Sequence, residues 1–330
     1  MYFQSRLRPA SLVLALLVSE AVLYGQNNVL SVGYTAPAFN VAPGQIVTLF
    51  TPPLNVPDGV ANQAPLPTSL SGVSVSVRVV GGFDSTGYPA SLPILRVYSS
   101  TACQTPSAAP CPNTQITIEI PTEGVCAKLH QPCSLPFPDI PPTLILNVKA
   151  RGVTGPDQPV SVGTAAPHLL SACDSIYGPP AEDCGQRDSW LVTHADGQLV
   201  SLTSPATVGE TITIYAVGLN DQPRAPILGG YPKTGYPADK PVQIDPGLTQ
   251  VMFGYRLALA AGAQIDGYAP LSHFISPTWV GLTPGYVGLF QINVTVPPAL
   301  PGTEPCEGTY NTSIALQNLS SGTVYICVQP

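Results

Sequence analysis

A phrase of alternating apolar and polar residues occurs twice in this chain and constrains its fold more than any other feature. From residue 290 to 296, apolar and mostly β-branched residues alternate with polar ones, and Pro297 follows. Strict alternation predicts a β-strand with one buried face and one face toward water. Residues 115–121 repeat the pattern, with Gln, Ile and the final Pro at matching places. The chain is therefore predicted to contain two copies of one β module.

A second pair of matching phrases supports the two-copy organisation. Val47 and Leu49, which follow a Pro-Gly turn, correspond to Ile212 and Ile214, which follow Val208-Gly209. Further strands are predicted at 70–80, 94–98, 144–148 with 160–162, 190–200 around an Asp-Gly turn, and 313–317 with 323–328. A strand is also predicted at 251–260, although its Leu and Ala content tolerates a helix. Each copy then offers about seven short strands, which is the number in an immunoglobulin-like sandwich. We predict an all-β protein with two tandem immunoglobulin-like domains, at 26–165 and 166–330. A single continuous barrel is the alternative, and it explains the repeat poorly.

Composition agrees with many short strands joined by turns. The 330 residues include 39 Pro and 30 Gly, and charged residues make up only 9% of the chain. At 44%, the hydrophobic content is too high for a disordered low-complexity segment. The formal net charge is −7 and no basic cluster occurs, which argues against nucleic acid or an anionic lipid surface as partner.

The N-terminus has the features of an export signal. Arg6 and Arg8 precede an almost unbroken apolar run from Leu12 to Val18, and we predict a cleaved signal peptide over residues 1–25. A membrane anchor is the alternative, but the run is shorter than the roughly 20 apolar residues that span a bilayer. No other segment could cross a membrane. The protein is therefore predicted to be secreted or held at the cell surface.

Eight cysteines in an exported chain predict a disulfide framework. Their proximity in sequence suggests four local bridges, although eight cysteines allow 105 pairings. A zinc site is the alternative, but the chain has no C-x-x-C pair and no histidine at zinc-finger spacing. The suggested pairs are Cys103–Cys111, Cys126–Cys133, Cys173–Cys184 and Cys306–Cys327.

Several phrases resemble one known family. Thr193 to Val200 (THADGQLV), Gly281 to Asn293 (GLTPGYVGLFQIN) and Ala42 to Val47 (APGQIV) are similar to the uncharacterised C-terminal domain of many exported proteins from Solibacter-type acidobacteria. The resemblance covers nearly all of the chain after residue 25. It implies a pair of TIG-like, immunoglobulin-like sandwiches, and the family offers no assigned activity or catalytic residue. The chain departs from the family in the Cys103/Cys111 insert of the first copy, which puts that sheet edge in doubt.

Motifs of catalysis are absent from the sequence. No G-x-S-x-G, H-E-x-x-H, P-loop or EF-hand pattern occurs. His194 and Asp196 flank an Asp-Gly turn, where Asp favours the turn conformation; a metal bound by this pair is the alternative. A carboxylate pair for glycoside hydrolysis is not excluded, because such pairs have no sequence signature. We predict no enzyme, no metal site and no cofactor.

Loop tyrosines are the best candidates for ligand contact. Tyr88 and Tyr236 both lie in a Thr-Gly-Tyr-Pro-Ala loop, and Tyr231 precedes Tyr236 closely. Rings on loops can stack on sugars or anchor a protein partner; the alternative is that each ring folds back over its own loop. Trp190, Trp279 and Tyr286 are instead expected to pack in the core or at a sheet edge.

The resulting hypothesis is a non-enzymatic exported protein with an adhesion, structural or ligand-presenting role. The first alternative is a carbohydrate-binding module or a glycan-active enzyme that uses the loop tyrosines. The second is a self-assembling surface subunit that associates through exposed sheet edges. The expected partners are an extracellular glycan, a protein or a second copy of the chain.

Overall fold

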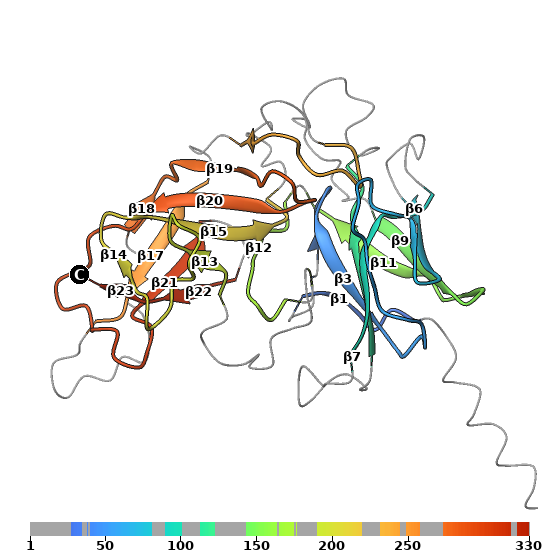
Figure 1. The fold of residues 1–330 in the computed structure, drawn as a ribbon, viewed down its shortest axis with the longest axis horizontal. Coiled ribbons are helices and arrows are strands. Elements are labelled where there is room, and N and C mark those ends of the chain that lie inside the picture. Colours follow the sequence, from blue (N-terminus) through green and yellow to red (C-terminus); the bar gives the residue numbers. More distant parts are fainter. Residues whose placement is uncertain are drawn as a thin grey trace, which may run out of the picture.

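The computed structural model of the chain is all-β, and no helix occurs among the residues it describes (Figure 1). The segment predicted to be a signal peptide, residues 1–25, lies outside the described part of the chain. Within the described part, no helix has the length and hydrophobicity needed to span a membrane. The described residues are 28–34, 38, 40–80, 90–100, 113–122, 143–163, 165–174, 176, 190–219, 232–244, 249–257, 273–317 and 322–329.

The first eleven strands form two sheets around one hydrophobic core. One sheet has the order β1-β3-β8-β7-β4, and the other has the order β2-β11-β9-β6-β5 with β10 paired to β9. Buried aliphatic side chains from both sheets meet in the core, so this N-terminal unit is a two-layer structure. Its strands are β1 (Ser31–Gly33), β2 (Asn40–Val41), β3 (Ile46–Thr51), β4 (Gly59–Val60), β5 (Ser69–Leu70), β6 (Val73–Val80), β7 (Ile94–Ser100), β8 (Asn113–Glu119), β9 (Thr143–Ala150), β10 (Val153–Thr154) and β11 (Gln158–Val162).

The remaining strands form a C-terminal unit with its own core. A sheet of order β12-β15-β20-β19-β16 also pairs β13 with β15, and it faces a sheet of order β18-β17-β21-β22 and the β14-β23 pair. The strands are β12 (His168–Leu169), β13 (Val192–Thr193), β14 (Ala206–Thr207), β15 (Thr211–Val217), β16 (Val242–Gln243), β17 (Val251–Tyr255), β18 (His273–Ile275), β19 (Trp279–Leu282), β20 (Phe290–Thr295), β21 (Thr312–Leu316), β22 (Val324–Ile326) and β23 (Val328–Gln329).

The repeated phrases occupy equivalent strands. In the N-terminal unit β3 pairs antiparallel with β8, so that Val47 lies opposite Ile118. In the C-terminal unit β15 pairs antiparallel with β20, and Ile212 lies opposite Val294. Each pair is the centre of a five-strand path with the same order of equivalents, and each unit also contains a parallel two-strand pairing, β2 with β11 and β14 with β23. The repeat in sequence is thus a repeat in topology.

Local signals for strands and turns are confirmed. β6 buries Val73, Val75 and Val77 on one face, and β17 is a strand over part of the segment whose Leu and Ala content also tolerated a helix. β9 and β11 pair antiparallel around the predicted turn, as do β21 and β22 at the end of the chain. These hairpins follow from alternation joined to turn residues.

The two central strands differ in how they use their polar face. β20 alternates between buried and half-buried residues, as an exposed sheet face requires. In β8 all seven residues are buried, including Gln115, Thr117 and Glu119. The same alternation therefore leads to two different environments, and the polar face of β8 is covered.

Hydrogen bonds join the two units near their boundary. The side-chain amide Nε2 of Gln45 donates to the carbonyl oxygen of Ala166 at 2.9 Å and to the hydroxyl of Tyr34 at 2.6 Å. The Tyr34 ring in turn stacks on His168, with 4.0 Å between ring centroids and 7° between planes. Polar groups of the two units therefore satisfy one another's hydrogen bonds at the boundary, as is usual for buried polar groups.

Apolar packing also crosses the boundary. Five residues of the C-terminal half belong to the core cluster of the N-terminal unit: Leu170, Ile176, Val217, Val287 and Leu289. Close backbone contact accompanies this packing, since a Cβ atom added at Gly288 would lie 2.6 Å from the carbonyl oxygen of Gly44. The junction is therefore a packed surface between the two units.

Candidate functional site

Of the three tyrosines predicted to contact a ligand, Tyr88 and Tyr231 lie outside the described residues. Tyr236 is described, and 43% of its surface is exposed. Its backbone N–H donates to the carbonyl oxygen of Lys233 at 2.9 Å, which closes a tight turn. Among the described residues no hydrogen bond to the Tyr236 hydroxyl is formed, so this ring does not fold back to donate its hydroxyl within that part of the chain.

The turn that carries Tyr236 is held by the N-terminal unit. The backbone N–H of Gly235 donates to the carboxylate of Glu119, and the N–H of Leu66 donates to the carbonyl oxygen of Gly235 at 2.8 Å. Next to these bonds, the N–H of Thr122 donates to the hydroxyl of Thr234 at 2.9 Å. The loop is therefore fixed at the junction of the two units, and its tyrosine is presented outward.

Tyr286 corrects one expectation. It was predicted to pack in the core or at an edge, but 51% of its surface is exposed. It lies in the turn between β19 and β20, and the neighbouring Gly285 N–H donates to the carbonyl oxygen of Ala238 at 3.1 Å. This bond joins the Tyr286 turn to the loop of Tyr236. Trp190 and Trp279, by contrast, are partly buried, as the sequence predicts.

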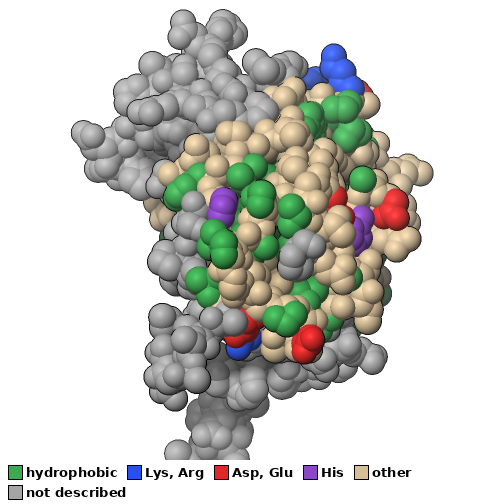
Figure 2. Space-filling view, turned by 90° about the vertical axis from the view of Figure 1, so that its left-hand side faces the viewer, with side chains coloured by type: hydrophobic (Ala, Val, Ile, Leu, Met, Phe, Trp, Pro, Cys, Tyr) green, Lys and Arg blue, Asp and Glu red, His purple; other side chains and the backbone are tan. Residues whose placement is uncertain are grey.

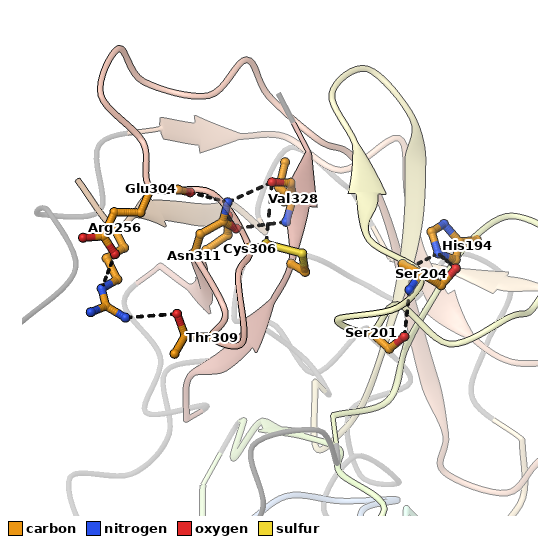
Figure 3. Close-up of a disulfide and its surroundings, with 11 residues drawn as sticks. His194, Ser201, Ser204, Arg256, Glu304, Cys306, Thr309, Asn311 and Val328 are labelled. Atoms are coloured by element: carbon orange, nitrogen blue, oxygen red, sulfur yellow. Dashed lines mark hydrogen bonds and ion pairs between the residues drawn. A yellow bond between two sulfur atoms is a disulfide. The ribbon is translucent and has the colours of Figure 1, made fainter. Parts of the chain in front are cut away.

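A second cluster of polar groups surrounds His194. Its Nδ1 atom lies 2.8 Å from Oε1 of Glu210. Its Nε2 atom lies 3.2 Å from both the hydroxyl and the carbonyl oxygen of Ser204 (Figure 3). Because an ionised carboxylate only accepts, Nδ1–H donates to Glu210. Nε2 accepts from the Ser204 hydroxyl when it is unprotonated and donates to a Ser204 oxygen when it carries a proton. Asp196, the neighbour in sequence, instead accepts from the N–H of Gln198 at 2.9 Å and shapes the Asp-Gly turn.

The order serine, histidine, carboxylate is the one used in nucleophilic catalysis, but the surroundings favour a structural role. The Ser204 N–H donates to the hydroxyl of Ser201 at 3.0 Å, while its carbonyl oxygen accepts from the Ser201 N–H at 2.9 Å. Ser204 is thus closed into a tight turn, and its N–H is already used. The cluster links the β13 hairpin, this turn and the start of β15, as shown by the bonds of His194, Ser204 and Glu210.

Glu210 gives this cluster a dependence on pH. Burial alone would raise the pKa of Glu210, but hydrogen bonds from the Thr207 side chain and backbone and from His194 lower it below the ordinary 4.5. A carboxyl with a lowered pKa in the folded state stabilises the fold at pH values above the unfolded pKa. That contribution is lost as the pH falls through the folded value.

We therefore expect Glu210→Gln to lower the thermal midpoint at neutral pH and to have a smaller effect below about pH 4.5. Thermal unfolding of both proteins between about pH 3 and pH 8 measures the difference. Glu307→Gln, at an exposed carboxylate, is the matched control and should leave the midpoint unchanged across the range. An equal difference between wild type and Glu210→Gln at both ends of the range would contradict the prediction.

The last predicted disulfide is formed. Cys306 and Cys327 are bonded across 21 residues, and Cys173 is disulfide-bonded as well. The predicted partner of Cys173, Cys184, lies outside the described residues, and so do both members of the Cys103–Cys111 and Cys126–Cys133 pairs. Beside the bridge, the buried side chain of Asn311 accepts from the Val328 N–H and donates to the Val328 and Glu304 carbonyl oxygens (Figure 3). Asn311 therefore has a structural role at this bridge.

A metal ion or a nucleic acid would require particular arrangements of side chains in the part of the chain that the structure describes. No group of three or more His, Cys, Asp or Glu residues that could hold a metal ion occurs there. On the face of the C-terminal unit in Figure 2, hydrophobic side chains appear singly or in small groups, and the few Lys and Arg side chains in view lie at its margin.

Comparisons with known proteins add little to these observations. No family model and no curated protein matches the chain. Among solved structures, the Yersinia pseudotuberculosis adhesin InvE is 11% identical with a TM-score of 0.20, and the alignment covers 93% of this chain and 61% of that one. The C-terminal domain of the Streptococcus agalactiae antigen I/II polypeptide BspA is 9% identical with a TM-score of 0.16, covering 91% and 99%. That of Streptococcus pyogenes AspA is 9% identical with a TM-score of 0.15, covering 92% and 100%. At such scores the similarities carry no argument, and the chain spans about three fifths of the adhesin.

Proposed function

We propose that the protein is a non-enzymatic, exported or surface-located protein of two tandem immunoglobulin-like domains, 26–165 and 166–330, with an adhesion or ligand-presenting role. The resemblance to the Solibacter-type family and the apolar segment before residue 26 support export. The repeated sheet topology supports the two-domain division. We propose that contact with the partner is made at the junction, by Tyr236 and Tyr286.

The observation that carries this proposal is the exposure of two aromatic rings on loops that are themselves well held. The two rings are 43% and 51% exposed, and their loops are joined by the bond from Gly285 to Ala238. The Tyr236 loop is also tied to the N-terminal unit through Gly235 and Thr234. Rigid aromatic side chains supply large contact area at low entropic cost. A fixed pair of tyrosines therefore suits recognition of an extracellular glycan or protein.

We expect the double substitution Tyr236→Ala with Tyr286→Ala to weaken partner binding by about tenfold or more, because exposed aromatic anchors dominate such contacts. Binding of the purified protein to an oligosaccharide array and to a panel of immobilised extracellular proteins measures it. Phe274→Ala is the matched control, since Phe274 is 49% exposed on β18 and belongs to the other sheet of the C-terminal unit.

The outcome also separates the two candidate partners. Sugar binding that the tyrosine substitutions abolish identifies a carbohydrate-binding module, whereas binding only to proteins identifies an adhesion module. Wild-type protein that binds nothing on either surface, or a double variant that binds as well as Phe274→Ala, would disprove a contact surface at the junction. Unchanged thermal midpoints of the variants would show that any loss is local.

A further inference from the structure

The polar face of β8 contains buried groups that have no partner. In antiparallel sheets, residues directly opposite each other share a face. Arg96 of β7 lies opposite Thr117, Tyr98 lies opposite Gln115, and Asn113 precedes Gln115 by two residues on β8. These side chains therefore line one face of the sheet, opposite to the face that carries Ile116 and Ile118 into the core.

Four atoms on this face lack any hydrogen bond although they are fully buried. They are two donors, Nη1 of Arg96 and Nε2 of Gln115, and two acceptors, Oε1 of Gln115 and Oδ1 of Asn113. Only 4% of Arg96, 1% of Gln115 and 5% of Asn113 is exposed. Native proteins pair nearly all such groups, so several unpaired atoms side by side require an explanation. A buried site for a polar ligand is one.

The charge of the site is set by Arg96. Its guanidinium lies over the ring of Tyr98, 4.4 Å from the centroid, and it forms no ion pair with any described residue. Burial lowers the pKa of Arg96, against the opposing effects of Tyr98 and Asp58. Asp58 itself accepts from the Ser99 N–H at 2.8 Å. A buried guanidinium with no ion-pair partner is costly, and an anion bound beside it would offset that cost.

The polar residues around Arg96 determine the size and the hydrogen-bonding groups of a ligand that would fit this face. The hydroxyls of Thr48 and Thr117 lie 3.2 Å apart and are bonded to each other. Glu119, the acid of this face, binds the N–H of Gly235 and lies about 13 Å along the strand from Gln115, given about 3.3 Å per residue. The unpaired atoms lie on Arg96 and Gln115, which are diagonal neighbours with Cα atoms about 7 Å apart, and on Asn113, which lies about 7 Å further along β8. The Arg96 guanidinium lies over the ring of Tyr98, the residue opposite Gln115, so it extends along the face towards the other unpaired atoms. A ligand of monosaccharide size that both accepts and donates can reach all of them.

We propose that this face binds a small hydroxylated carboxylate, such as a hexuronic acid, with Arg96 facing the carboxylate and Gln115 and Asn113 facing the hydroxyls. Arg96 lies on β7, and Gln115 and Asn113 lie on β8, which pairs antiparallel with β7. The site is therefore built on paired strands, which hold side chains more rigidly than loops do. It is separate from the proposed tyrosine contact, which lies on loops. The two proposals therefore stand or fall independently.

Thermal unfolding of the full chain with glucuronate, glucose or acetate tests the site, at about 10 mM of each. A ligand that binds the native state raises its stability by mass action. We expect a saturable rise of the midpoint with glucuronate and none with glucose, which lacks the charge, or with acetate, which lacks the hydroxyls. Calorimetric titration should give an affinity for glucuronate that Arg96→Met weakens by about tenfold or more.

A second variant keeps the test decisive if Arg96→Met does not fold. Gln115→Met removes two unpaired buried atoms, so it should raise the midpoint of the free protein while it weakens glucuronate binding. The proposal is overturned if glucuronate gives no shift, if Arg96→Met binds it as well as wild type, or if Gln115→Met lowers the midpoint. It is also overturned if crystals soaked in glucuronate show only water molecules bridging the four atoms.

Discussion

Gly218→Ala is expected to lower the free energy of unfolding by about 3 kcal/mol. Gly218 has φ +70°, where an L-residue costs roughly 1–2 kcal/mol. An added Cβ would also lie 2.2 Å from the carbonyl oxygen of Ala166 and 2.8 Å from the side-chain amide of Gln45. The same oxygen accepts from Gln45, so relieving the clash would break a bond between the units. Urea unfolding of wild type and variant measures the loss.

Gly197→Ala separates backbone strain from this clash. Gly197 has φ +86° in the Asp-Gly turn, and a Cβ there would meet nothing within 4 Å. The substitution should therefore cost only the conformational part, about 1 kcal/mol. Equal losses at both glycines would show that the junction tolerates the methyl group, and would contradict a tightly packed contact between Gly218, Ala166 and Gln45.

Removal of the Cys306–Cys327 bridge should have an effect of similar size. The chain-entropy description assigns about 3 kcal/mol to a bridge that closes a loop of this length, here 21 residues. Cys327 is fully buried, so the paired substitution Cys306→Ala with Cys327→Ala keeps the site apolar. Urea unfolding under oxidising conditions gives the loss. A loss below about 1 kcal/mol would mean that the bonds of Asn311 already hold the two segments together.

The repeated strands could be predicted because their information is local. Alternation with β-branched residues specifies strand and buried face together, since a slip of one residue would expose the whole apolar set. The phrases at 115–121 and 291–297 accordingly occupy equivalent strands, and the turn at Asp196-Gly197 forms where the dipeptide predicts it. Element types and the two-copy organisation were therefore accessible from the residues alone.

The environment of each strand face was not accessible in this way. Gln115, Thr117 and Glu119 have the same polarity as Gln291, Asn293 and Thr295, yet only the first set is buried. What covers a sheet face is decided by segments distant in sequence, and alternation carries no information about them. Tyr286 shows the converse, because its ring was expected to pack in the core or at a sheet edge, and 51% of its surface is exposed.

The partner of His194 was missed for a related reason. Sequence proximity pointed to Asp196, whereas the carboxylate that binds the ring is that of Glu210, 16 residues away. A signal was present, since Glu210 sits in the turn that opens β15, and β13 pairs with that strand. Pairing of β13 with β15 brings the two residues together, and only the topology shows this. A carboxylate in the turn that precedes a paired strand is therefore a candidate partner for a histidine at the end of the neighbouring strand.

The shared core at the junction has a consequence for how the chain reaches its folded state. Synthesis proceeds from the N-terminus, and domains generally fold as they emerge. The N-terminal unit, however, packs against Val287 and Leu289, which are made more than a hundred residues after its last strand ends at Val162. Until they arrive, part of its apolar surface stays open to water. The nascent chain therefore passes through a long interval in which a chaperone has a surface to hold.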